Sequence, residues 1–142
     1  MDNNESERVM PDKIFINLPV KDLEASKKFY ETIGLVNNKQ FTDETAAAMV
    51  LTDHIYVMLL THPKFAAFSP APIADTQNNT SALYALSCET RDYVDEIVKK
   101  AVAAGGSTYG DPKDHGFMYQ HGFRDPDGHT WEPFYMDPSF VE

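Results

Sequence analysis

The run Asp125-Pro126-Asp127-Gly128 near the C-terminus constrains the fold more than any other feature of the chain. It predicts a tight turn, because proline presets its own φ and glycine accepts a left-handed conformation. Aromatic-rich segments flank the turn, so we predict a hairpin whose register the turn fixes. Strand alternation then places Glu132 on the same face as Thr130 and Phe134. If that face is buried, the carboxylate requires a partner, a metal or a ligand.

Composition excludes several classes of function. The chain has 142 residues and a formal net charge of −10, so the phosphate backbone of a nucleic acid would be repelled. No apolar run approaches the roughly 20 residues that cross a membrane, and the first residues lack the apolar region of a signal peptide. The single cysteine, Cys88, excludes an internal disulfide and a multi-cysteine zinc site. We therefore expect a cytoplasmic protein that binds neither nucleic acid nor membranes.

The order strand, helix, three strands is predicted twice, with a period of about 70 residues. The first copy has a strand at 13–20, a helix that Asp22 caps and Gly34 ends, and strands at 38–42, 46–51 and 55–61. The second copy has a strand at 82–88, a helix at 91–104, and strands at 107–109, 117–124 and 130–136.

These units predict an α+β fold. Two βαβββ modules side by side would form a curved mixed sheet around a cavity, with the helices outside. The domain would cover residues 13–137, with the first module at 13–61 and the second at 81–137. Residues 62–80, rich in proline and polar side chains, are predicted to be a linker with a short helical turn. Residues 1–12 are predicted to be a flexible N-terminal tail.

Two motifs resemble a known family. The segment from Asn17 to Tyr30, NLPVKDLEASKKFY, resembles the strand-to-helix opening of the vicinal oxygen chelate superfamily, and residues 125–132 resemble its closing hairpin. That superfamily includes glyoxalase I, bleomycin resistance proteins, fosfomycin resistance proteins and extradiol dioxygenases. The resemblance covers nearly the whole chain except the tail. It implies the doubled βαβββ fold and a homodimer, because many relatives pair to complete their cavities.

The resemblance also implies up to four metal ligands on the concave sheet, at Phe15, near Leu59, at Leu83 and at Glu132. Apolar side chains coordinate no metal, and one carboxylate does not hold a divalent ion tightly. Moving the second position by one or two residues supplies no better ligand. We therefore expect no cofactor and no tightly bound metal. A weakly bound divalent ion, held by Glu132 with His121, is the alternative.

The residues predicted to bind a ligand are Phe15, Asn17, Met58, Tyr119, His121, Glu132 and Phe134. Glu132 could accept hydrogen bonds, neutralise a cation or act as a catalytic base, or it could pair with a nearby cation or hydroxyl. Asn17 could orient a ligand or bond the neighbouring backbone. His129 lies beside the tight turn, where we expect exposure to solvent.

Three functions follow from these residues. The first is a metal-independent cavity of the glyoxalase and bleomycin-resistance type that binds a small organic molecule and could act by sequestering it. The second is an enzyme of the lyase, isomerase or dioxygenase type that uses Glu132 alone or with a weak metal. The third is a non-catalytic, dimeric regulatory protein. The acidic composition favours neutral or cationic ligands over anionic ones.

Overall fold

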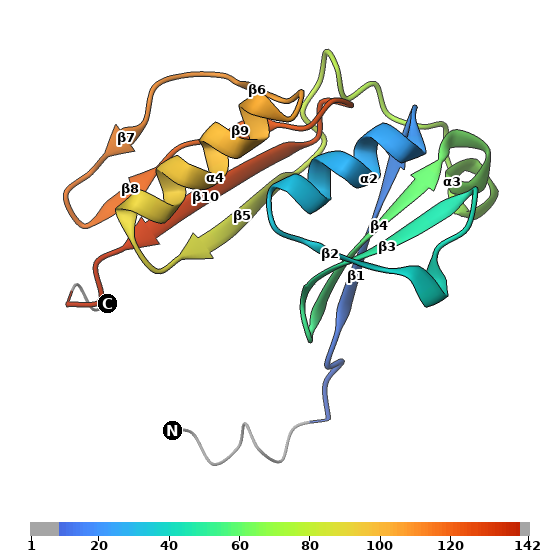
Figure 1. Cartoon of the computed structure of the whole chain (residues 1–142), viewed down its shortest axis with the longest axis horizontal. Helices are drawn as coiled ribbons and strands as arrows, with labels where there is room; N and C mark the ends of the chain where they lie inside the picture. Colours follow the sequence, from blue (N-terminus) through green and yellow to red (C-terminus); the bar gives the residue numbers. More distant parts are fainter. Residues whose placement is uncertain (1–8, 140–142) are drawn as a thin grey trace.

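The computed structural model describes residues 9–139 of the chain (Figure 1), so most of the predicted N-terminal tail lies outside the described residues. The first module contains β1 (Ile14–Val20), α2 (Leu23–Thr32), β2 (Val36–Asn38), the 3-10 helix η1 (Lys39–Phe41), β3 (Ala46–Thr52) and β4 (Ile55–Thr61). A short helix, α3 (His62–Phe68), opens the linker. The second module contains β5 (Leu83–Cys88), α4 (Arg91–Ala103), β6 (Ser107–Thr108), β7 (Lys113–Asp114), β8 (Met118–Gln120), β9 (Phe123–Arg124) and β10 (Thr130–Met136).

The strands form two mixed sheets rather than the single sheet expected from the sequence. The first sheet has the order β1-β4-β3-β2, and in the second sheet β10 lies between β5 and the segments β8 and β9. In each module the opening strand pairs in parallel with the closing strand, β1 with β4 and β5 with β10. This repeated topology confirms the predicted α+β fold with two βαβββ modules.

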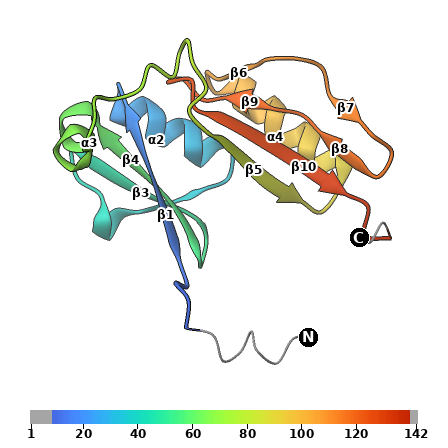
Figure 2. The same cartoon turned by 180° about the vertical axis from the view of Figure 1, so that it is seen from behind.

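Helices α2 and α4 cover the same side of the two sheets, as Figures 1 and 2 show from opposite directions. Asp22 caps α2 by accepting a hydrogen bond from the Ala25 amide, and Thr90 caps α4 in the same way through the Tyr93 amide. The apolar stripes of both helices pack against alternate strand residues. The core that results runs through both modules and includes Leu18, Phe29, Tyr30, Val57, Leu59, Ile97, Phe123 and Trp131.

Two predicted strands differ in the structure. The segment 38–42 turns into η1 because the Asn38 side chain accepts a hydrogen bond from the Gln40 amide and starts a helical turn. The segment 117–124 is divided into β8 and β9, and the break lies opposite Pro133, which has no amide hydrogen for the ladder. Strand β7, which pairs with β8, was not predicted.

The closing turn binds to the first module. The Lys21 amide donates to Asp127 Oδ1 at 2.9 Å, and the His129 ring Nε2 lies 2.8 Å from the Pro19 carbonyl oxygen. His129 is therefore only 4% exposed, and the expectation that it faces solvent is wrong. In the described part of the chain, no helix is long and apolar enough to cross a membrane.

Candidate functional site

The side of the two sheets opposite α2 and α4 is here called the open face, and Figure 2 views the molecule from this side. Strand β10 alternates as predicted: Trp131 and Pro133 are buried, whereas Glu132 and Phe134 are only partly buried and lie on the open face. In the first module α3 packs over one end of this face, beside β1 and β4, where Leu60 is buried.

The first module contributes three of the predicted ligand-binding residues to the open face. Phe15 is 53% exposed, and its ring stacks on Tyr56 with centroids 4.6 Å apart. Asn17 and Met58 are neighbours in the register of β1 with β4. Asn17 Nδ2 donates to the Phe15 carbonyl oxygen at 3.1 Å, which is the backbone bond that the sequence left as an alternative to ligand binding.

Tyr119 does not join this set. It is the register partner of Tyr135 and therefore projects from the helix-covered face, whereas Glu132 projects from the other. Its hydroxyl donates to Asp95 of α4 at 2.5 Å, and the Arg91 guanidinium lies 5.3 Å from its ring. The bond to Asp95 raises the pKa of Tyr119 to about 12. The expectation that Tyr119 lines the concave face is corrected, because the register of 117–124 against β10 was unknown from the sequence.

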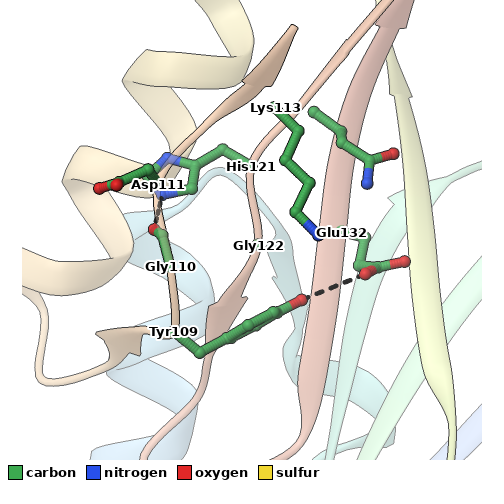
Figure 3. A pocket seen from close by; sticks show the side chains of 8 residues that line it. Tyr109, Gly110, Asp111, Lys113, His121, Gly122 and Glu132 are labelled. Carbon is green, nitrogen blue, oxygen red and sulfur yellow. Dashed lines mark hydrogen bonds between the residues drawn. The ribbon is translucent and has the colours of Figure 1, made fainter. Parts of the chain in front are cut away.

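His121 and Glu132 make separate hydrogen bonds (Figure 3). His121 Nε2 lies 2.8 Å from the Gly110 carbonyl oxygen and 2.9 Å from Thr108 Oγ1. Glu132 Oε2 accepts a 3.3 Å hydrogen bond from the Tyr109 hydroxyl. Both residues line one small pocket. His121 lies opposite Pro133 in the register, so its ring projects toward the helix-covered side like Tyr119, whereas Glu132 projects from the open face. The His121–Glu132 pair considered from the sequence is therefore not formed.

Tyr109 is a site residue that the sequence analysis missed. Its ring packs against Gly122, where any Cβ would collide with the phenol, and the Arg124 guanidinium lies 5.9 Å from the ring. Partial burial and the neighbouring Glu132 carboxylate raise the pKa of Tyr109 to about 12, so its hydroxyl remains a donor at neutral pH. The signal that could have revealed it is Gly122 itself, since a glycine within a strand often marks a close approach.

The donor set does not fit a metal centre. Phe15 and Leu83, at two of the implied ligand positions, lie on the open face and are 53% and 58% exposed. The registration of both opening strands is therefore as predicted. Leu59, in contrast, is buried in the core, so the β4 position on the open face is Met58 or Leu60. Within residues 9–139, no group of three or more His, Cys, Asp and Glu side chains could hold a metal ion.

Two βαβββ modules, with helices on one side and an open face that carries Glu132 on the other, define a glyoxalase-like architecture. The family model for the glyoxalase/bleomycin resistance protein/dioxygenase superfamily matches residues 14–132. The chain belongs to this superfamily. Among curated proteins, none matches the sequence.

Solved structures of the same fold are distant in sequence. A hypothetical protein from S. aureus is 24% identical, with a TM-score of 0.76 over 94% of this chain and 99% of that one. A glyoxalase/bleomycin resistance protein/dioxygenase family enzyme from Burkholderia phytofirmans is 19% identical, with a TM-score of 0.71 over 86% of this chain and 96% of that one. A fosfomycin resistance protein from Listeria monocytogenes is 20% identical, with a TM-score of 0.66 over 94% of this chain and 95% of that one. At this identity the likeness establishes the fold alone.

Proposed function

We propose that the protein binds a small organic molecule on the open face, with Glu132 as its polar anchor and without a tightly bound metal ion. One observation carries this proposal. At the positions where the family resemblance implies metal ligands, the open face presents Phe15 and Leu83, which cannot coordinate, beside one carboxylate. Such a surface suits apolar contact with a ligand and a small number of polar contacts that orient it.

The same exposed side chains support a homodimer. Phe15, Leu83 and Met136 are large apolar residues of β1, β5 and β10 that lie on the open face and are each more than two-fifths exposed. Apolar area of this kind is commonly covered by a partner molecule. A second copy seated over the open face would enclose Glu132 and complete the binding cavity. Light scattering coupled to size exclusion measures the mass directly, and a monomer at micromolar concentration would contradict the dimer.

Two measurements test the binding proposal. Elemental analysis of the purified protein should find less than stoichiometric Ni, Zn, Mn and Fe, and a stoichiometric metal would contradict metal independence. A thermal-shift screen of planar aromatic and cationic compounds, with fosfomycin included because of the similar structures, should find ligands. Binding at 100 times Kd adds about 2.7 kcal/mol to the free energy of unfolding, which raises Tm by several degrees.

An enzyme is the second candidate, and the Tyr109–Glu132 hydrogen bond favours it. A carboxylate that accepts a proton and a phenol that donates one are the parts of an acid–base pair. In that case Glu132 would remove a proton next to a carbonyl group of the substrate, as in a lyase or isomerase. Turnover of any ligand from the screen, lost in Glu132→Gln while binding persists, would favour the enzyme over a sequestering protein.

A further inference from the structure

The pocket beside Glu132 contains two opposite charges that are not paired with each other. It is lined by Tyr109, Lys113, Gln120 and Glu132, together with Asp111, His121 and two glycines. The Lys113 side chain makes no ion pair and no hydrogen bond with any described residue, and the same holds for the side-chain amide of Gln120. Glu132 uses Oε2 for Tyr109 and leaves Oε1 without a partner in the described chain.

The register places these groups on one face. Lys113 pairs with Gln120, which pairs with Phe134, so all three project from the open face together with Glu132. Figure 3 shows the Lys113 side chain extending toward Glu132 from the neighbouring hairpin. The Asp111 carboxylate points away on the far side of His121, whose ring nitrogen is engaged by Gly110 and Thr108.

The size of the pocket limits what enters it. Its volume is about 70 Å³, which is room for a few atoms of the size of a water molecule. It can therefore hold the polar end of a ligand, and the rest of the molecule would lie on the adjoining open face. That adjoining surface is apolar near β5 and β10, where Leu83, Ala85 and Phe134 share the face with Glu132.

We propose, on the basis of the function proposed above, that the ligand is a zwitterion of the α-amino acid type with an apolar or aromatic side chain. Its ammonium group would bond Glu132 Oε1, and its carboxylate would bond Lys113 Nζ and the Gln120 amide. Its side chain would lie against Phe134, the register neighbour of Gln120 on the open face. A net-neutral ligand of this kind also agrees with the strong negative charge of the chain, which disfavours simple anions.

Three aromatic probes separate the two charges. L-phenylalanine carries both, 2-phenylethylamine lacks the carboxylate, and 3-phenylpropionate lacks the ammonium. Calorimetric titration of the full chain should give phenylalanine a Kd at least about tenfold lower than that of either analogue, because each lost contact is a hydrogen bond to a charged group. Equal or tighter binding of the analogues would overturn the zwitterion proposal.

Paired variants assign each charge to its residue. Lys113→Gln should raise the Kd of phenylalanine about tenfold, so that phenylalanine no longer binds more tightly than 2-phenylethylamine. Glu132→Gln should abolish the tighter binding of phenylalanine relative to 3-phenylpropionate. Lys99→Gln, on α4 outside this pocket, is the matched control and should leave all three constants unchanged. If circular dichroism shows that Lys113→Gln is folded and this variant binds phenylalanine as tightly as the native chain does, the assignment of the carboxylate to Lys113 is wrong.

The same titrations distinguish this inference from the proposed function. Binding of neutral aromatic compounds without charge selectivity would overturn this inference and leave the proposed function standing. No binding of any aromatic compound would contradict both.

Discussion

The Tyr30 hydroxyl donates a 2.5 Å hydrogen bond to the Asp125 carboxylate, which joins α2 of the first module to the closing turn of the second. The same hydroxyl accepts a 3.0 Å bond from Trp131 Nε1, and Asp125 Oδ1 accepts from the amides of Asp127 and His129. Asp125 is only 3% exposed, so this chain of bonds lies inside the shared core. A buried network of this kind stabilises a fold only while each member keeps its partners.

Tyr30→Phe should therefore destabilise the protein. The change leaves Asp125 Oδ2 and Trp131 Nε1 without the hydroxyl that now bonds both, and each unsatisfied buried group costs about 1–3 kcal/mol. Urea denaturation should show that the free energy of unfolding of the variant is lower than that of the native chain by at least about 1 kcal/mol. Tyr56→Phe is the control, because its hydroxyl donates to the Asp53 carbonyl oxygen at an exposed site. Equal losses in the two variants would contradict the role of the buried network.

The burial of Asp125 predicts a pH dependence of stability. Desolvation raises the pKa of Asp125 above its ordinary value of 3.8, although His129 and Tyr30 act in the opposite direction. A carboxyl whose pKa is higher in the folded state contributes stability that is fully present below pH 3.8 and is lost as the pH rises through the folded pKa. Relative to Asp125→Asn, the native chain should thus be more stable near pH 4 than near pH 7. Parallel stability curves for the two proteins would refute a raised pKa.

Tyr109 predicts a spectroscopic signal at high pH. Partial burial, followed by the charge of Glu132 and the hydrogen bond to it, raises the pKa of Tyr109 to about 12. The difference in phenolate absorbance between the native chain and Tyr109→Phe should therefore titrate near this value. In a Glu132→Gln background the same difference should titrate lower, but still above 10 because the burial remains. The subtraction is needed because Tyr119 also has a pKa of about 12.

The open face predicts that metal binding can be introduced. Phe15→His and Leu83→His place imidazoles at two implied ligand positions, and Glu132 remains at a third. The double variant should bind Zn²⁺ or Ni²⁺ stoichiometrically by calorimetry, whereas the native chain should not. Ile14→His combined with Leu83→His is the control, since Ile14 alternates with Phe15 along β1 and projects from its other face. Equal metal binding by this control would mean that the face is misassigned.

Local sequence patterns encode some features of this fold and not others. The facing of Glu132 was predicted because a turn of known type sits only a few residues before it and fixes the register. The facing of Tyr119 was not predicted, because a shift of one residue in the pairing of 117–124 with β10 would move Tyr119 to the other face, and only the structure shows which pairing is formed. The end residues of β4 and β10 agree with the predictions, because both strands are bounded by turn or helix-capping residues.

Features that depend on contacts between distant segments were missed. Tyr109 meets Glu132 across 23 residues, and no spacing rule connects a tyrosine after a two-residue strand to that carboxylate. His129 was expected in solvent because turns are usually exposed, yet this turn packs against β1, 110 residues away. The fold could be recognised from its motifs, whereas the surroundings of Glu132 required the three-dimensional arrangement.

The binding of the closing turn to Pro19 and Lys21 has a consequence for recognition. These bonds connect the start of β10 with the end of β1, so we expect the surfaces that present Phe15 and Glu132 to keep one mutual orientation in the free protein. A compound that touches both would meet a receptor already shaped for it, and ordering of the protein would subtract little from its affinity. Loss of the hydrogen bonds between the closing turn and β1 should therefore weaken ligand binding, although these bonds do not contact the ligand.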